Sequence, residues 1–102
     1  MLKNRTMIKL CGITRREDVV FAVNTGVDAL GFILAESPRQ VNLEGIRELS
    51  HNLPPFVNRV AVVVNPEPEK VAEIEKSDLF NYIQFHGSEQ PKMLTSTKLK
   101  SI

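Results

Sequence analysis

Four short apolar runs alternate along the chain with segments of helical length, and this alternation limits the fold more than any other feature. The runs cover residues 7–11, 29–34, 60–64 and 82–85. The second and third are nearly continuously apolar, as expected for parallel strands that are buried on both faces. Strands that alternate with helices through short connections form right-handed βαβ units in a parallel sheet. The sequence therefore predicts an α/β fold.

The segments between the runs carry signals for helix starts and ends. Thr14-Arg15-Arg16-Glu17 has the spacing of a capping box, and Gly26 is placed to end the helix that follows. Asn42 is expected to cap a second helix, which the prolines at 54–55 terminate. Asn65-Pro66 is expected to open a third helix, and Ser88 a fourth. The predicted order of elements is βαβαβαβα.

Two architectures fit this order. It suits a small doubly wound sheet, and it also suits part of a (β/α)8 barrel, which normally takes about 250 residues and occasionally nearer 200. Four βα units in 102 residues is the spacing of a compact TIM-type barrel that stops halfway. The pattern alone leaves both architectures open. No linker marks a second domain, so residues 1–102 are expected to form a single domain.

Composition excludes several classes of function. Thirteen basic and twelve acidic side chains give a net charge of +1, so we expect no nucleic-acid or membrane partner. One cysteine cannot form an internal disulfide, and we expect a cytoplasmic protein without signal peptide or membrane span. One cysteine and two widely spaced histidines do not form a metal site. Dinucleotide, P-loop and serine-hydrolase motifs do not occur, so neither a metal nor a cofactor is expected.

The chain's only cysteine lies where α/β folds build active sites. In Lys9-Leu10-Cys11-Gly12-Ile13-Thr14, an apolar strand ends at Cys11 and a helix opens shortly afterwards. Catalytic residues of such folds lie at the carboxyl ends of strands, and the positive end of a helix favours a thiolate. Taken alone, however, a single cysteine such as Cys11 is more often a small buried hydrophobic residue than a catalytic one.

Three further polar residues lie at or just beyond strand ends, namely Arg39, Asn65 and His86. Period-two alternation places Gln84 on the same face as His86. The carboxyl ends of parallel strands meet at one rim, where separate polar groups can bind a small molecule. Each residue also has a structural interpretation. Arg39 could be a solvated loop charge, His86 could bond a loop carbonyl, and Asn65 is more simply a helix cap.

Five sequence blocks carry a more specific resemblance. They are Lys-Leu-Cys-Gly-Ile-Thr at 9–14, and residues 28–33, 37–39, 62–65 and 83–87, in this order. Together they resemble the first half of the phosphoribosylanthranilate isomerase family, (β/α)8 barrels of tryptophan biosynthesis. The resemblance covers roughly residues 8–89, and the first block is the most specific. It favours the barrel over the doubly wound sheet.

The resemblance implies a cofactor-free Amadori rearrangement of N-(5-phosphoribosyl)anthranilate, an aldose–ketose isomerisation that yields the carboxyphenylamino-deoxyribulose phosphate. One group protonates the ribose ring oxygen, and another removes a proton from the adjacent carbon. By resemblance, Cys11 is the base and Arg39 holds the anthranilate carboxylate. Gln84 and His86 match family residues that line the site. The implied partner is therefore a small phosphorylated sugar–anthranilate substrate.

The chain also departs from the family pattern. The family's general acid follows its fifth strand and its phosphate loops follow strands seven and eight, so the 102 residues end before them. The tail from Lys92 no longer resembles the family's fourth helix. We therefore expect an amino-terminal half barrel of about four βα units that is inactive by itself.

An open half barrel leaves aliphatic side chains uncovered, at a cost on the order of 1.5–3 kcal/mol each. A homo-oligomer is therefore expected, or pairing with a chain that supplies the second half barrel. Two alternatives stay open. One is a non-catalytic half-barrel remnant that self-associates, and the other is an unrelated flavodoxin-like binding module. The second would need an acidic cluster or phosphate loop after the first strand, and Gly12-Ile13-Thr14-Arg15-Arg16 provides neither.

Overall fold

Strands and helices alternate along the chain in the computed structural model, which describes residues 8–35, 37–51, 53–54, 56–85 and 100–101. Their order is β1 (Lys9–Cys11), α1 (Arg16–Thr25), β2 (Ala29–Ile33), α2 (Leu43–Leu49), β3 (Asn58–Val63), α3 (Pro68–Ser77), β4 (Tyr82–Phe85) and β5 (Lys100–Ser101). The four predicted strands are present, with small changes at their ends. The helix predicted from Ser88 lies outside the described residues.

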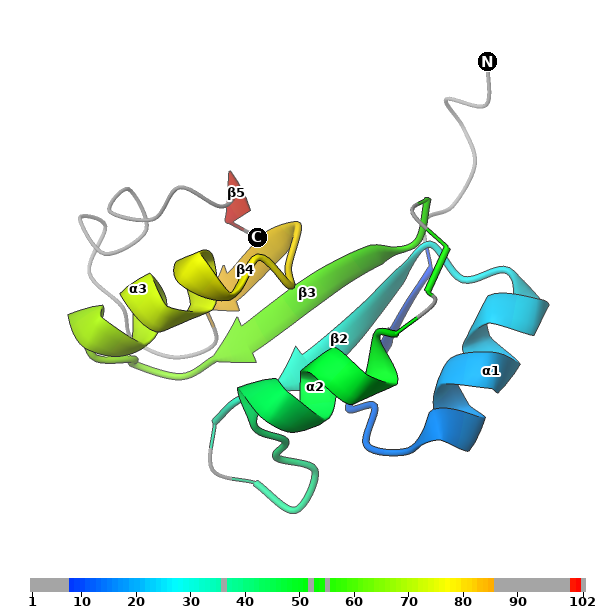
Figure 1. Ribbon diagram of the computed structural model, residues 1–102, viewed down its shortest axis with the longest axis horizontal. Helices are drawn as coiled ribbons and strands as arrows, with labels where there is room; N and C mark the ends of the chain where they lie inside the picture. Colours follow the sequence, from blue (N-terminus) through cyan, green and yellow to red (C-terminus); the bar gives the residue numbers. More distant parts are fainter. Residues whose placement is uncertain (1–7, 36, 52, 55, 86–99, 102) are drawn as a thin grey trace.

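The strands form one five-stranded parallel sheet in the order β1-β2-β3-β4-β5. A doubly wound sheet would reverse its strand order at a switch point, whereas a barrel adds each strand next to the last. Helices α1, α2 and α3 lie on one side of the sheet (Figure 1). The topology is therefore that of a (β/α) barrel opened along β1 and β5.

The start of α1 differs from the predicted capping box. Its N-cap is Arg15, one residue later than Thr14, and Arg15 makes no side-chain capping bond. The Arg15 guanidinium lies 3.3 Å from a carboxylate oxygen of Asp18, and this hydrogen bond raises the pKa of Arg15. The predicted end of the helix is confirmed, because Gly26 adopts a φ of 88° and its N–H donates to Ala22 and Val23.

The remaining helices include one confirmed cap and one correction. The Asn42 side chain caps α2, accepting from the N–H of Gly45 at 2.7 Å as predicted. The predicted opening of α3 at Asn65-Pro66 is wrong, because Asn65 adopts a φ of 42°, which belongs to a turn and not to an N-cap. The helix begins at Pro68 after the N-cap Glu67, since a proline at the first helical position loses no hydrogen bond.

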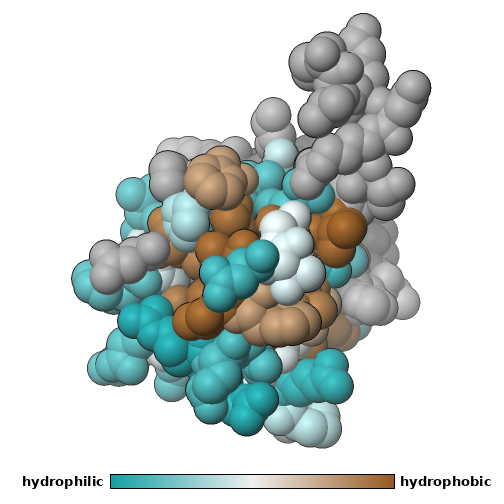
Figure 2. Space-filling view, turned by 90° about the vertical axis from the view of Figure 1, so that its right-hand side faces the viewer, coloured by the Kyte–Doolittle hydropathy of each residue, from teal (hydrophilic) through white to brown (hydrophobic). Residues whose placement is uncertain are grey.

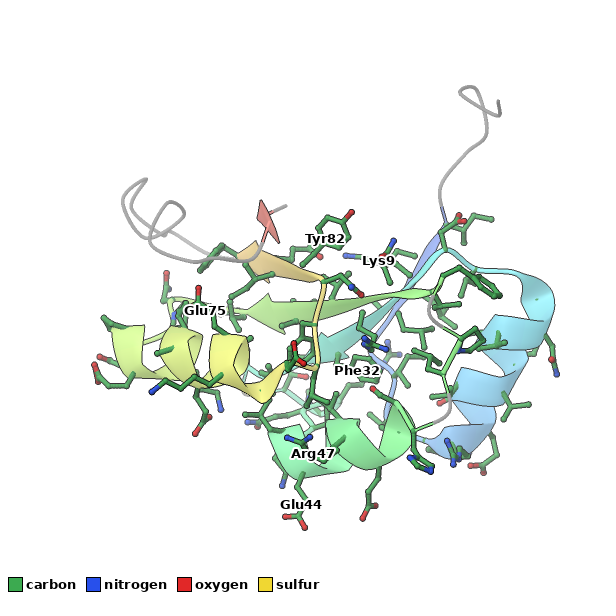
Figure 3. All side chains as sticks on the ribbon, turned by 45° about the horizontal axis from the view of Figure 1, so that its top comes forward. Lys9, Phe32, Glu44, Arg47, Glu75 and Tyr82 are labelled. Carbon is green, nitrogen blue, oxygen red and sulfur yellow. The ribbon has the colours of Figure 1, made fainter. Side chains whose placement is uncertain are left out.

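One face of the sheet packs against the helices and forms the hydrophobic core. Phe32 is fully buried between the sheet and the helices (Figure 3), and its ring meets that of Phe80 edge-on with centroids 6.5 Å apart. Alternate residues of β2, β3 and β4 point the same way. The core residues from these strands and the helices include Leu30, Ala61, Val63, Ile83, Val19, Ala22, Ile46, Val71 and Ile74.

The other face of the sheet carries the intervening residues and corresponds to the interior of a barrel. Figure 3 shows Lys9 and Tyr82 on this side, away from α2 and α3. Gly31, Val60 and Tyr82 pair in register across β2, β3 and β4. We call this surface the barrel-interior face.

Apolar side chains are exposed on the side of the molecule that bears α1 (Figure 2). Leu10 on β1 is 36% exposed, and Val20 and Phe21 on α1 are 50% and 66% exposed. We call these three residues the β1–α1 patch. It borders an edge strand, the position at which a closed barrel would continue. Among the described helices, none is both long and apolar enough to cross a membrane.

The Asn42 cap gives a direct test of the local energetics. Replacing Asn42 by Ala leaves the N–H of Gly45 without its partner, and we expect unfolding free energy to fall by about 1 kcal/mol. Glu67→Ala is the matched control, because Glu67 occupies the N-cap of α3 without a side-chain capping bond. Urea unfolding measures both variants, and equal losses would contradict a specific role for the Asn42 side chain.

Candidate active site

The turn after β1 is held against β2 by a shared acceptor. The backbone N–H groups of Gly12 and Ile13 both donate to the carbonyl oxygen of Gly31, at 2.9 and 3.2 Å. Gly12 adopts a φ of 84°, a conformation that side-chain-bearing residues rarely take. The buried side chain of Ile13 anchors the turn in the core. Cys11, the last residue of β1, is thereby fixed at the carboxyl edge of the sheet.

The Cys11 sulfur lies directly over a glycine. Cys11 and Gly31 are register partners, and a Cβ placed on Gly31 would lie 3.0 Å from Cys11 Sγ. The absence of a side chain at 31 thus gives the sulfur room on the barrel-interior face. The thiol is exposed and forms no disulfide, so a ligand can reach it.

Arg39 crosses the same turn from the loop after β2. Its backbone N–H donates to Ser37 Oγ at 3.0 Å, and the N–H of Val41 donates to Ile33 O at 2.9 Å, which ties down the loop. A Cβ on Gly12 would lie 2.8 Å from Arg39 Cδ and 3.1 Å from one guanidinium nitrogen. The arginine side chain therefore rests on the residue that follows Cys11.

The other predicted site residues have different outcomes. Gln84 of β4 accepts a hydrogen bond from the Lys9 ammonium across the barrel-interior face. His86 lies outside the described residues. Asn65 follows β3 as predicted but is a turn residue and not a helix cap. The structure thus brings Arg39 to the Cys11 turn and links Gln84 to the same strand as Cys11.

The charge of this region favours an anionic ligand. Lys9 and Arg39 are both cationic. Among the described residues, ion pairs join Arg15 to Glu17 and Asp18, and Lys70 to Glu73. Neither of the two cations belongs to those pairs. Within the described ranges, no cluster of three or more His, Cys, Asp or Glu side chains could hold a metal ion. Guanidinium and ammonium groups bind carboxylates and phosphates.

Sequence reasoning missed the parts played by Lys9 and by the two glycines. Lys9 lies two residues before Cys11, so strand alternation puts both side chains on one face, but nothing in the sequence identified Gln84 as the partner of Lys9. Gly12 and Gly31 lie within the quoted sequence blocks, but the blocks did not predict which side chains pack against them. The positive φ of Gly12, its close contact with Arg39 and the close contact of Gly31 with Cys11 become visible only in the folded structure.

A parallel sheet in sequential strand order, with polar groups at the carboxyl ends of its strands, is typical of (β/α)-barrel proteins. Comparison with known proteins narrows the class. Residues 8–102 match the family model of N-(5'-phosphoribosyl)anthranilate (PRA) isomerase, and the chain belongs to this family. The match extends beyond residue 89, where the resemblance was expected to end, and includes the tail from Lys92. Strand β5, which continues the sheet beside β4, lies within that tail.

Relatives and solved structures agree on this family. An N-(5'-phosphoribosyl)anthranilate isomerase from Petrotoga mobilis is 58% identical over 95 residues, covering 93% of this chain and 46% of the relative. The Thermotoga maritima relative is 46% identical over 83 residues, covering 80% and 40%. The T. maritima crystal structure superposes with a TM-score of 0.90 at 38% identity, over 95% of this chain and 49% of that one. The chain spans about half the length of the relatives it matches.

Two further solved structures describe states of family members. One is a phosphoribosylanthranilate isomerase in complex with reduced 1-(o-carboxyphenylamino)-1-deoxyribulose 5-phosphate. It superposes with a TM-score of 0.90 at 38% identity, and the match covers 95% of this chain and 52% of the isomerase. Another reports monomers generated from the dimeric T. maritima enzyme, with a TM-score of 0.83 at 34% identity. It covers 95% of this chain and 50% of that one.

The contact between Gly12 and Arg39 predicts a selective effect of adding a methyl group. Gly12→Ala and Gly26→Ala both force alanine into a positive φ, so each should cost about 1 kcal/mol of unfolding free energy. Only in Gly12→Ala does the added methyl group contact another side chain, that of Arg39, because nothing lies within 4 Å of a Cβ on Gly26.

We expect the side-chain Nε–H resonance of Arg39 to shift in the Gly12→Ala variant and to stay in place in Gly26→Ala. Two-dimensional ¹H–¹⁵N NMR measures the shift, and urea unfolding measures the stabilities. An unchanged Arg39 resonance in Gly12→Ala would show that the guanidinium does not rest on this turn.

Proposed function

We propose that this chain forms the amino-terminal half of the active site of a cytoplasmic phosphoribosylanthranilate isomerase. In this proposal residues 1–102 are one truncated (β/α)-barrel domain. Cys11 acts as the general base, Arg39 binds the anthranilate carboxylate, and Gln84 and His86 line the substrate site. The observation that carries the proposal is the Arg39 side chain lying across Gly12, beside Cys11, in a chain of this family.

The chemistry needs one acid and one base in sequence. Protonation of the ribose ring oxygen opens the sugar and leaves a carbon–nitrogen double bond to the anthranilate nitrogen. The base then removes the proton from the neighbouring carbon, and the resulting enol relaxes to the ketone. A thiolate suits the second step when it is accessible and near a cationic or helix-end environment. Cys11 is exposed, and the Arg39 guanidinium lies across the next residue, Gly12.

Arg39 suits the carboxylate of the substrate for geometric reasons. A guanidinium forms paired hydrogen bonds with a carboxylate, and Arg39 approaches from a loop held at both Ser37 and Ile33. Such a clamp would set the anthranilate ring over the turn and hold the sugar carbon near the sulfur. A family member binds a reduced product analogue that carries this carboxyphenylamino group.

The remaining wall of the site is proposed to come from the part of the relatives that this chain does not match. By family resemblance, that part carries the acid that protonates the ring oxygen and the loops that hold the phosphate. The exposed β1–α1 patch supports such a covering, because Phe21 is 66% and Leu10 36% exposed beside an edge strand. The second half barrel, or a second copy of the chain, would bury these side chains. The alternative of a non-catalytic remnant is not favoured by the comparisons.

Reconstitution tests this proposal. We expect the chain alone to show no turnover of phosphoribosylanthranilate. Mixed with the carboxyl-terminal half of the Petrotoga mobilis relative, it should form a complex that isomerises the substrate, here called the reconstituted enzyme. Cys11→Ser should lower kcat at least about 100-fold, because a hydroxyl is a far weaker base than a thiolate. A well-formed complex without turnover, or a Cys11→Ser variant with full kcat, would refute the assignment.

Arg39 gives a second, separable test in the reconstituted enzyme. Arg39→Ala removes the charge-assisted bond to the carboxylate, so KM should rise about 10- to 100-fold. Arg47→Ala is the matched control, because Arg47 is an exposed arginine on α2, on the opposite side of the sheet from Lys9 (Figure 3). Steady-state kinetics at varied substrate concentration measure both. Equal KM values for the two variants would mean that Arg39 is an ordinary surface charge.

A further inference from the structure

Lys9 is a cation on the barrel-interior face that the proposed reaction has not used. It lies two residues before Cys11 on β1, and its side chain therefore points to the same face as the thiol. Its ammonium donates a hydrogen bond to Gln84 Oε1 on β4, although β2 and β3 lie between the two strands.

The curvature of the sheet makes this contact possible. In register, Lys9 pairs with Ala29 and Ala29 with Asn58, whereas Gln84 pairs with Val62, farther along β3. In a flat sheet these two side chains would be far apart. Strands of a barrel tilt by about 35–45° to its axis, so residues at one height are offset in register from strand to strand. The bond therefore spans the concave interior of the half barrel.

The bond also decides which end of the Gln84 amide remains available. An ammonium group can only donate, so it must face the carbonyl oxygen of the amide. The NH2 group is then the end left to meet a ligand. Without Lys9, the amide could rotate and offer either a donor or an acceptor.

We propose that Lys9 is a positioning residue that holds Gln84 with its NH2 group ready to donate to an acceptor oxygen of the substrate. The proposal rests on the proposed function, which assigns Gln84 to the substrate site. The substrate's carboxylate, hydroxyl and phosphate oxygens are all acceptors, so a fixed donor matches its chemistry. Lys9 thus contributes to substrate binding through Gln84 and not through the proton transfers.

Kinetics of the reconstituted enzyme separate this role from a structural one. Lys9→Met should raise KM about 10-fold and leave kcat within about twofold, and Lys9→Arg should restore most of the loss. Adding Lys9→Met to Gln84→Leu should change KM little, because the lysine acts through the amide that is already gone. Independent, multiplying effects of the two changes would overturn the proposal.

Gln84→Glu separates the two ends of the side chain. A carboxylate still accepts from Lys9, so unfolding free energy should be kept, but the NH2 donor is lost and KM should rise about 10-fold. An unchanged KM would overturn the proposal, since the NH2 group would then not contact the substrate.

A measurement without turnover keeps this inference distinct from the proposed function. In the chain alone, the side-chain NH2 resonances of Gln84 should shift in Lys9→Met and return close to their original positions in Lys9→Arg. An inactive reconstituted enzyme would count against the proposed function. If the Gln84 NH2 resonances do not shift in Lys9→Met, the positioning role is refuted, whether or not the reconstituted enzyme is active.

Discussion

The site depends on one carbonyl group. Gly31 O accepts hydrogen bonds from both Gly12 and Ile13, and this pair of bonds bends the chain from the end of β1 toward α1. The same glycine has no side chain, so the Cys11 sulfur can lie over β2. Because Gly12 in this turn has no side chain, the Arg39 side chain can pack directly against it. Backbone pairing between two neighbouring strands thus sets the positions of both the thiol and the guanidinium.

Much of the fold could be predicted because strand burial leaves a simple pattern. The run at 82–85 predicted β4 exactly as it occurs, since it is flanked by polar residues on both sides. Helix starts were harder, because Thr14 and Asn65 are both good capping residues by type. Arg15 and Glu67 occupy the N-caps instead, and neither makes a side-chain capping bond. A suitable residue type therefore does not by itself fix the first residue of a helix.

The sequence predicted which residues approach the rim, but not what they touch. Position after a strand was enough to select Cys11 and Arg39. The contact of Arg39 with Gly12 depends on how residues 37–41 fold back, which involves hydrogen bonds to Ser37 and Ile33. The pairing of Lys9 with Gln84 depends on sheet curvature, a property of several strands together. Neither can be read from spacing within a single segment.

Curvature also explains why half a barrel can carry half a site. The Lys9–Gln84 bond joins β1 to β4 at a register offset that only a tilted, curved sheet allows, so the concave interior already exists within these residues. The groups proposed to bind the anthranilate and remove the proton lie on this one wall. In the proposed reaction the base and the acid act on different atoms of the sugar, and they can therefore lie on opposite walls. Closing the barrel would then bring the acid to a base whose position β1 and β2 have already set.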